Sequence, residues 1–429
     1  MNKQTIKDIK ELRGKRVLLR CDFNVPINKQ TGEITDNGRI LESLATIRYL
    51  KESGAKVILC SHLGKPKGGV DSEFSLAPVA KELSMIFEEE VKLAKDVVGE
   101  DAFLLASKMQ EGDVILLENT RFEPGETKND LELSKKLASL ADYYIDDAFG
   151  AVHRAHSSIA GVADYIPAYI GFLIEKELNI LGNALENPKR PFVSILGGAK
   201  VSEKIEVIES LLEKADTLII GGGMANTFFS AMGYGVGASL CEEDKINVAQ
   251  KIMESASEKG VKLLLPVDVK IGKGIDDTQS QIIEWSEETN KIPDDMGIFD
   301  IGPKTVKLYS EELKRTGRIG AKEEEAKTVM WNGPLGVFEK KQWAEGTMEI
   351  AEAVSRLGQG VTTIVGGGET ASAVKKAEVT EKITHISTGG GATLEFIVGF
   401  IKGEILPGIK AIPDRDIKKN IDIDDERGS

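Results

Sequence analysis

The chain has 429 residues, of which 41% are hydrophobic and 29% are charged, so it holds enough apolar material for two or three cores. This composition excludes a peptide hormone, a small adaptor and a wholly disordered chain. A net charge of -14 argues against non-specific binding to nucleic acid or to an anionic membrane, so any anionic ligand must be held by a local basic cluster.

Short β-branched runs, each followed by a glycine or polar turn and a segment of helical period, predict parallel strands joined by crossover helices. The predicted strands are Arg16–Arg20, Lys56–Cys60, Val114–Leu117, Tyr143–Asp146, Phe192–Leu196, Thr217–Gly221, Lys262–Pro266, Thr328–Trp331, Val361–Val365 and Ile383–Ser387. The helices predicted between later strands include Ser202–Ala215, Glu242–Lys259 and Gly346–Leu357. About ten strands exceed what one open sheet usually carries, so we expect an α/β protein with two doubly wound domains.

The boundary between the two domains is expected near residues 172–191. Phe172–Leu185 has a helical pattern, and the sequence Glu186-Asn187-Pro188-Lys189-Arg190-Pro191 then breaks the chain before a new strand. We therefore predict an N-terminal domain at residues 1–172, a linking helix or hinge at 173–190 and a second domain from 191. From Gly408 onward the apolar periodicity is lost, which predicts a solvated tail.

Three scattered cysteines, Cys21, Cys60 and Cys241, are too few for a disulfide framework or a zinc site and indicate reduced thiols. The N-terminus shows neither an apolar signal segment nor an Arg- and Ser-rich leader, and no window approaches 18 uncharged apolar residues. We expect a cytoplasmic protein with neither a membrane nor a nucleic acid as partner.

Polar and basic residues follow the strands of the first half, where ligands bind in open α/β sheets. They are Asp22-Phe23-Asn24, Ser61-His62-Leu63-Gly64-Lys65, Glu118-Asn119-Thr120-Arg121-Phe122 and Asp147-Ala148-Phe149, with Arg39, His153 and Arg154 on the loops that follow. Arg39, Arg121 and Arg154 would gather with His62 and Lys65 on one rim. Guanidinium groups bind phosphate and carboxylate oxygens bidentately, so this rim predicts a small acidic substrate.

Glycine-rich turns follow the strands of the second half: Leu196-Gly197-Gly198-Ala199-Lys200, Gly221-Gly222-Gly223-Met224-Ala225, Gly366-Gly367-Gly368-Glu369-Thr370 and Thr388-Gly389-Gly390-Gly391-Ala392. Glycine lets backbone N–H groups approach phosphate oxygens, and the next helix adds its positive end. No Walker A stretch occurs, and no Gly-x-Gly-x-x-Gly follows the first strand, which counts against a dinucleotide-dependent dehydrogenase. A nucleotide and a phosphorylated co-substrate together point to phosphoryl transfer.

The run Arg16-Val17-Leu18-Leu19-Arg20-Cys21-Asp22-Phe23-Asn24-Val25-Pro26 closely resembles the signature of the phosphoglycerate kinase family. Further stretches match in the family's order: Ser61-His62-Leu63-Gly64, Glu118-Asn119-Thr120-Arg121-Phe122, Ala155-His156-Ser157-Ser158, Leu196-Gly197-Gly198-Ala199-Lys200-Val201-Ser202, Asp300-Ile301-Gly302-Pro303-Lys304-Thr305, Trp331-Asn332-Gly333-Pro334 and Ser387-Thr388-Gly389-Gly390-Gly391-Ala392. The resemblance covers roughly residues 2–408.

The resemblance implies two Rossmann-like domains facing each other across a hinged cleft, with a nucleotide-binding domain at 191–404. It also implies that the last segment, 405–429, returns to the first domain. The implied activity is reversible phosphoryl transfer between 1,3-bisphosphoglycerate and ADP, giving 3-phosphoglycerate and ATP, with Mg²⁺ bound to the nucleotide as MgATP or MgADP. We expect a monomer.

The resemblance also implies the site residues. Those that would bind the glycerate are Asp22, Phe23, Asn24, Arg39, His62, Leu63, Gly64, Lys65, Arg121 and Arg154. Those that would bind the nucleotide are Lys200, Lys204, Gly302, Glu339, Gly366, Gly367, Gly368, Glu369 and Thr370. Among them, Arg39 and Lys204 would stabilise the transferring phosphoryl group, and Glu369 would ligate magnesium. No general base is needed toward ATP, so Asp22 is interpreted as an acceptor for a substrate hydroxyl.

Two positions depart from the family's pattern. Lys65 stands where the family has arginine, and a point charge cannot form a bidentate fork. Glu369 stands where the family has aspartate. Mg²⁺ demands near-octahedral geometry at about 2.0–2.1 Å, so the longer Glu369 would bind directly with a shifted loop or through a water. The tail Ala411–Ser429 also extends past the family's usual end.

Two alternatives remain at this stage. One is another acyl-phosphate kinase that acts on a related small acid. The other is a catalytically silent nucleotide-binding or scaffold protein with the same fold. The presence of Arg39, Lys204 and an acid at position 369 disfavours the silent relative, which would be free to lose at least one of them.

Overall fold

The structure is a computed structural model and describes residues 1–67, 69–315 and 324–415. These residues form two compact units. Unit 1 consists of Met1–Asn179 together with the C-terminal segment from Ile405, and unit 2 is Ile180–Glu404. The division falls within the helix α5 (Phe172–Glu186), inside the stretch that the sequence marks as the link.

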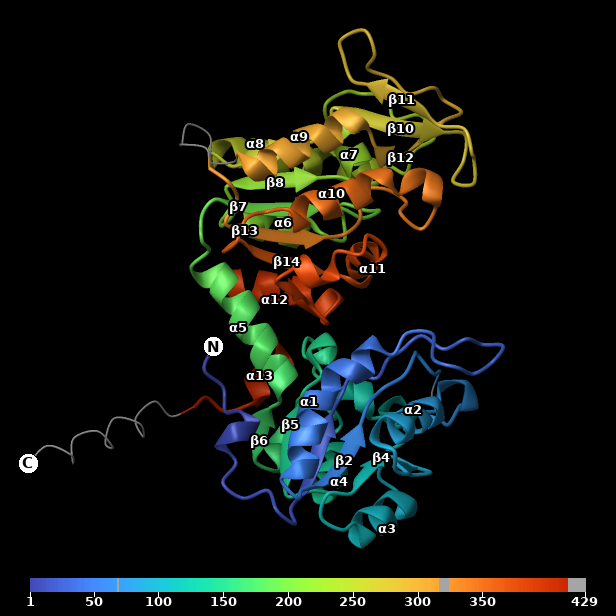
Figure 1. Ribbon diagram of the computed structural model, residues 1–429, viewed down its shortest axis with the longest axis vertical. Helices are drawn as coiled ribbons and strands as arrows, with labels where there is room; N and C mark the ends of the chain where they lie inside the picture. The colour runs from blue at the N-terminus through green and yellow to red at the C-terminus, as the bar shows by residue number, and fades with distance from the viewer. Residues whose placement is uncertain (68, 316–323, 416–429) are drawn as a thin grey trace, which may run out of the picture. The chain divides into compact units, whose positions relative to one another are not determined.

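Unit 1 is built on a parallel sheet of order β3-β4-β2-β1-β5-β6. Figure 1 labels β2, β4, β5 and β6 of this sheet. Its strands are β1 (Arg16–Arg20), β2 (Lys56–Cys60), β3 (Lys92–Leu93), β4 (Val114–Leu116), β5 (Tyr143–Asp146) and β6 (Ala168–Ile170). Its helices are α1 (Gly38–Glu52), α2 (Ala77–Phe87), α3 (Glu100–Lys108) and α4 (Leu131–Ser139). The central strands are buried on both faces, which explains their unbroken β-branched and leucine runs.

Unit 2 repeats the architecture with a parallel sheet of order β15-β14-β13-β7-β8-β9. Its strands are β7 (Phe192–Leu196), β8 (Thr217–Ile220), β9 (Lys262–Leu264), β13 (Thr328–Asn332), β14 (Thr362–Gly366) and β15 (His385–Ile386). Its helices are α6 (Ile205–Leu212), α7 (Met224–Ala231), α8 (Ile246–Glu258), α9 (Pro303–Lys314), α10 (Glu345–Ser355), α11 (Gly368–Lys376) and α12 (Gly391–Lys402). The predicted fold class, two doubly wound parallel sheets, is confirmed.

Several predicted element ends are wrong by a few residues. The predicted strand at 262–266 stops at Leu264, because Pro266 has no N–H for the ladder. The predicted helix at 202–215 begins only at Ile205, because residues 202–204 form a turn that carries Lys204 to the helix start. The last predicted strand, 383–387, pairs only at His385 and Ile386.

A second sheet in unit 2 has no counterpart in the sequence prediction. It is antiparallel, of order β11-β10-β12, and consists of β10 (Asp268–Gly272), β11 (Gln281–Glu284) and β12 (Gly297–Ile301). The register of β10 against β12 shifts between Lys270 and Ile271. This insertion lies between β9 and β13 in the chain, and its strands are too short and too mixed in polarity for a period-2 signal.

The prediction of a solvated tail from Gly408 is wrong over the described residues. A short helix, α13 (Pro407–Ala411), packs into unit 1, where Ile409 and Ile412 are buried. The backbone N–H of Gly408 donates to Val152 at 2.8 Å, and Lys3 Nζ donates to the carbonyl of Ile412 at 2.9 Å. The two apolar residues therefore anchor a segment whose periodicity is too brief to detect. The predicted tail from residue 416 lies outside the described residues.

Candidate active site

The basic rim of unit 1 lies at the carboxyl ends of four neighbouring strands. The strand β1 pairs with β2 and β5, and β2 pairs with β4, all in parallel. Parallel strands end at the same edge of a sheet, so the loops after β1, β2, β4 and β5 meet there. These loops carry most of the predicted glycerate-binding residues.

Asp22 and Arg39 form an ion pair at this edge. Arg39 lies in the first turn of α1 and donates from Nη1 to Oδ2 of the buried Asp22, while 38% of the Arg39 side chain stays exposed. Asp22 Oδ1 accepts from the backbone N–H of Asn24 at 3.2 Å. Asn24 Oδ1 in turn accepts from the N–H of Gly64 at 2.8 Å, which ties the loop after β1 to the loop after β2. The pair holds a guanidinium in place and leaves part of it accessible.

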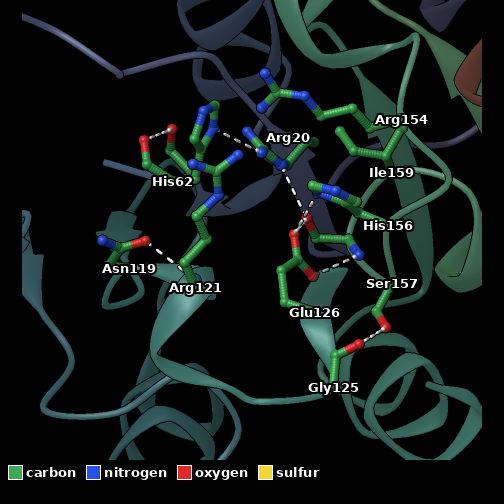
Figure 2. A network of polar contacts seen from close by, with 12 residues as sticks. Arg20, His62, Asn119, Arg121, Gly125, Glu126, Arg154, His156, Ser157 and Ile159 are labelled. Carbon is green, nitrogen blue, oxygen red and sulfur yellow. Dashed lines mark hydrogen bonds and ion pairs between the residues drawn. The ribbon is translucent and has the colours of Figure 1, made fainter. Parts of the chain in front are cut away.

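His62 lies among the arginines Arg20, Arg39, Arg121 and Arg154. Figure 2 labels Arg20, at the end of β1, together with Arg121 and Arg154. Burial lowers the pKa of His62 well below its usual value, and the charges of Arg20, Arg121, Arg154 and Arg39 lower it further. The imidazole is therefore neutral at physiological pH, and the charge of the cluster resides on its guanidinium groups.

The arginines after β4 and β5 are positioned by local hydrogen bonds. Arg121 donates from Nη1 to the carbonyl of Gly64 at 2.5 Å, and burial lowers its pKa. Arg154 donates from Nε to His153 Nε2 at 2.9 Å. Burial and neighbouring arginines lower the pKa values of His153 and His156 to about 4, so both are neutral.

The remaining predicted glycerate-binding residues lie in the same loops but differ in exposure. Phe23 and Leu63 are buried, and their backbone N–H groups donate to Ser61 Oγ and Asn119 Oδ1. These two residues support the loops. Lys65 is exposed.

The sequence-based set omits three buried polar residues that contact the cluster: Arg20, Glu126 and Ser158. Arg20 and Ser158 lie within the stretches 16–26 and 155–158, which match the family, and Glu126 lies outside them. Arg20 could have been found from the sequence, because it is a charged residue that follows three apolar residues at the end of a predicted strand.

Unit 2 contains a cavity of about 310 Å³ at the carboxyl edge of its own sheet. Glycines and three carboxylates are part of its lining, namely Gly198, Gly222, Gly223, Gly336, Asp300, Glu339 and Glu369. At Gly222, which has φ +70, an added Cβ would lie 2.7 Å from the carbonyl oxygen of Gly198. Close backbone approach at this turn therefore requires glycine. The rest of the lining includes Leu335, Val337 and Phe229, which suit a flat apolar ring.

Lys204 lies at the N-cap of α6 and is buried. Its Nζ donates to the backbone carbonyl of Asn332 at 3.0 Å and to Asn332 Oδ1 at 2.6 Å. Burial lowers the pKa of Lys204 to about 8, and the nearby charges of Glu369 and Glu203 oppose that shift. The ammonium group is thus a desolvated cation fixed near the turn that carries Glu369.

The turn at 366–370 connects β14 to α11. Gly367 has φ +89, which a side chain rarely adopts, and α11 begins at Gly368. The hydroxyl of Thr370, which is buried, accepts from the backbone N–H of Gly333 at 2.7 Å. Glu369 is exposed in the first turn of α11 and lines the cavity.

Three other predicted nucleotide-binding residues lie in unit 2. Glu339 is exposed and lines the cavity, and Lys200 is exposed. Gly302 precedes α9, where a Cβ would lie 2.3 Å from the carboxylate of Asp268. Asp268 accepts from the backbone N–H groups of Lys304 and Thr305, so Gly302 makes room for this cap.

Over residues 1–67, 69–315 and 324–415, no group of three or more His, Cys, Asp or Glu side chains could by itself hold a metal ion. A single carboxylate such as Glu369 fits Mg²⁺, because that ion is bound through one or two carboxylates together with substrate phosphates and waters. Within the same ranges, none of the helices has the length and apolarity required to cross a bilayer.

The chain is similar to known proteins over nearly its whole length. The family model described as phosphoglycerate kinase matches residues 6–400. Phosphoglycerate kinases of Clostridium tetani and Clostridium perfringens are 54% and 53% identical to the chain, over 96% of it and over 98% and 99% of their own lengths. Solved phosphoglycerate kinases from Coxiella burnetii and Pyrococcus horikoshii have TM-scores of 0.81 and 0.80 at 41% and 33% identity, covering 95% of this chain and 98% of theirs. The chain therefore belongs to the phosphoglycerate kinase family.

Proposed function

We propose how the two units divide the phosphoglycerate kinase reaction. As a member of the family, the chain transfers a phosphoryl group reversibly between 1,3-bisphosphoglycerate and ADP, giving 3-phosphoglycerate and ATP. Unit 1 binds the glycerate and unit 2 binds the nucleotide. The observation that carries this division is the gathering of arginines around His62 in unit 1, while unit 2 has a glycine-lined cavity with apolar walls.

The glycerate site is assigned to Asp22, Asn24, Arg39, His62, Arg121 and Arg154. The guanidinium groups bind the 3-phosphate and the carboxyl group, since planar forks match both kinds of oxygen. Asp22 accepts a hydrogen bond from the substrate hydroxyl. Phe23, Leu63 and Gly64 shape the loops, and Lys65 contributes a long-range positive charge.

The nucleotide site is assigned to the cavity of unit 2. The backbone N–H groups of Gly366, Gly367 and Gly368 face phosphate oxygens at the start of α11. Glu339 accepts from ribose hydroxyls, and the apolar lining contacts the base. Lys200, Gly302 and Thr370 complete the assigned set.

Two cations stabilise the group in transfer. The transferring phosphoryl spreads charge over three oxygens and needs positioning more than covalent help. Arg39 presents a partly exposed guanidinium held by Asp22, and Lys204 presents a buried ammonium held by Asn332. Both groups are fixed by protein partners before any substrate arrives, so little reorganisation is required at the moment of transfer.

Magnesium fits the carboxylate of Glu369 together with nucleotide phosphates and water. When bound, the ion neutralises phosphate charge. We also infer that the chain acts as a cytoplasmic monomer. The support is that its cysteines, Cys21, Cys60 and Cys241, are free thiols and that each unit has its own set of assigned site residues.

A coupled assay tests the activity and the substrate assignment. A mixture of 3-phosphoglycerate, MgATP, NADH and an excess of a dehydrogenase that reduces 1,3-bisphosphoglycerate should show NADH oxidation only when the purified protein, 3-phosphoglycerate and MgATP are all present. Faster release of ADP from MgATP with another small acid than with 3-phosphoglycerate would contradict the substrate assignment.

A further inference from the structure

A chain of buried side chains ends at His62. Arg20, the last residue of β1, is 1% exposed, and its guanidinium has three partners. Its Nε donates to Ser158 Oγ at 2.9 Å, its Nη1 donates to the carbonyl of Cys21, and its Nη2 lies 3.1 Å from His62 Nδ1. Figure 2 shows Arg20 between His62 and the loop that carries Ser158.

The other end of the chain is a buried carboxylate. Ser158 donates from Oγ to Glu126 Oε1 at 2.5 Å and from its backbone N–H to Oε2 at 3.0 Å. Glu126 is 0% exposed, so it supplies a buried negative charge for the buried Arg20. A hydroxyl can donate only one hydrogen bond. Ser158 Oγ donates its bond to the carboxylate of Glu126, so toward Arg20 it can only accept. The direction of every hydrogen bond from Glu126 to Arg20 is therefore fixed.

The contact with Arg20 decides where His62 carries its proton, and the bonds to Ser158 and Glu126 hold Arg20 in place for that contact. Arginine donates and never accepts, so Nδ1 of His62 must be the acceptor and the neutral ring must hold its proton on Nε2. The groups acting on the ring besides Arg20 are Arg39, Arg121 and Arg154, all cationic. An imidazolium would be repelled by these charges. An unprotonated Nε2 would repel an anionic oxygen, so only the Nε2–H form serves an acidic substrate.

We propose that Arg20, anchored through Ser158 to Glu126, is a positioning residue that fixes His62 as a neutral Nε2–H donor toward an acidic oxygen of the substrate. The inference rests on the assignment of His62 to the glycerate site under Proposed function. The arginines supply charge, and His62 adds a directional hydrogen bond whose strength does not change as the pH moves across the physiological range.

The direct test is ¹⁵N NMR of the full-length protein labelled at histidine, whose sequence holds four histidines in all. The two nitrogens of a neutral imidazole have well-separated shifts, so the spectrum identifies the protonated one. Assignment of His62 uses the resonance lost in His62→Gln. The free protein should show the Nε2–H form from pH 6 to pH 8. A proton on Nδ1, or an imidazolium in that range, would overturn the proposal.

Adding 3-phosphoglycerate separates the proposal from the function on which it rests. The Nε2–H resonance should shift as the ligand binds. If the ring is in the Nε2–H form but its resonances do not shift when 3-phosphoglycerate is added, the assignment of His62 to the glycerate site is contradicted. A ligand-sensitive ring with its proton on Nδ1 would contradict the chain from Arg20 to Glu126.

Two neighbouring serines give a matched pair of variants. Ser158 and Ser157 are both 0% exposed, but the Ser157 hydroxyl bonds only to the carbonyls of Gly125 and Asp130, not to Arg20. Ser158→Ala should raise KM for 3-phosphoglycerate about three- to tenfold with kcat retained, the effect of one weakened hydrogen bond. Ser157→Ala should leave KM for 3-phosphoglycerate unchanged. Equal KM values in the two variants would contradict the inference.

Replacing Arg20 probes the same chain from its centre. Arg20→Met keeps length without donors and should let His62 populate both neutral forms, whereas Arg20→Lys should restore part of the Nε2–H population. Retention of a pure Nε2–H form in Arg20→Met would overturn the proposal. If that variant does not fold, the wild-type spectrum and the serine pair still decide.

Discussion

The pairing of Arg39 with Asp22 shows how a cation can be held and still remain available. Asp22 is buried and receives one guanidinium nitrogen, while more than a third of the Arg39 side chain is exposed. The pair is partly solvated, so its contribution to stability is small. Its value is geometric, because it fixes a side chain that would otherwise sample many rotamers.

Arg39→Ala should lower kcat far more than it raises KM for 3-phosphoglycerate, since Arg39 is assigned to the transferring group. Loss of one such donor removes about 2.7–4 kcal/mol of transition-state stabilisation, so kcat should fall by roughly two to three orders of magnitude. Steady-state kinetics measures both constants. Arg48→Ala, an exposed arginine of the same helix, is the control and should behave as wild type. An unchanged kcat with a raised KM would reassign Arg39 to ground-state binding.

Glu369 offers a test of the metal assignment. If its longer arm holds magnesium, Mn²⁺ should support activity at least as well as Mg²⁺, and Glu369→Asp should shift the Mn²⁺/Mg²⁺ activity ratio toward Mg²⁺. Glu369→Gln should raise KM for MgATP. The alternative is that Glu369 only stabilises the start of α11, worth about 0.3–1 kcal/mol. A lowered thermal midpoint with unchanged metal preference and nucleotide KM would establish that alternative.

The elements that carry the site were predictable where a strand is buried on both faces. Strands such as Arg16–Arg20 and Phe192–Leu196 are mostly apolar and buried, and their ends match the sequence prediction. The strands β3 and β6 were missed because two and three residues are too few to show a pattern. The antiparallel strands β10 to β12 were missed because polar residues and glycine interrupt their apolar residues.

For the candidate site, the residues could be predicted from the sequence, but the contacts that position them could not. The resemblance supplied residue identities such as His62 and Lys204, and the strand order places their loops together. The contact of Arg20 with Ser158 joins residues 138 positions apart in the sequence, and no local pattern encodes it. The catalytic and binding roles assigned to these residues remain predictions.

The junction between β5 and α5 contains a buried carboxylate. Asp147 Oδ1 accepts from the backbone N–H groups of Leu173 and Ile174 in the first turn of α5, and burial raises the pKa of Asp147 to about 7. The unfolded carboxyl loses its proton near pH 4, so between about pH 4 and pH 7 the unfolded state binds fewer protons than the folded state. This group therefore lowers the free energy of unfolding as the pH rises through that window.

Asp147→Asn should remove that dependence, because the amide oxygen can still accept from both N–H groups and does not ionise. The stability of wild type relative to the variant should fall by about 1.4 kcal/mol for each pH unit across the window and stay constant above it. Urea unfolding of both proteins at several pH values measures the difference. A difference that is constant from pH 4 to pH 7 would contradict the raised pKa.

At the scale of the whole molecule, each unit has a large hydrophobic core of its own among the described residues. The three tryptophans, Trp285, Trp331 and Trp343, all belong to unit 2. Tryptophan fluorescence therefore reports on unit 2, while far-UV circular dichroism reports on both. Unit 1 is completed by residues from both ends of the chain, with a bridge between Lys3 and Asp414.

Ile409→Ala should destabilise unit 1 by about 2–5 kcal/mol, the usual effect of truncating a buried isoleucine. We expect an earlier component in the dichroism transition with no shift of the tryptophan midpoint. Ile405→Ala, which removes a side chain that is 45% exposed in the same segment, is the control and should leave both signals unchanged. Equal shifts of both signals in Ile409→Ala would show that the units unfold as one.

The central claim is that the glycerate and the nucleotide bind to different units, and calorimetric titration of two variants tests it most directly. Arg121→Gln should weaken 3-phosphoglycerate binding by about tenfold or more, the effect of losing a hydrogen bond to a charged group, and leave the Kd for ADP unchanged. Glu339→Gln should weaken ADP binding and leave 3-phosphoglycerate unchanged. If Arg121→Gln weakens ADP, or if either variant weakens both ligands equally, the division of the reaction between the units is contradicted.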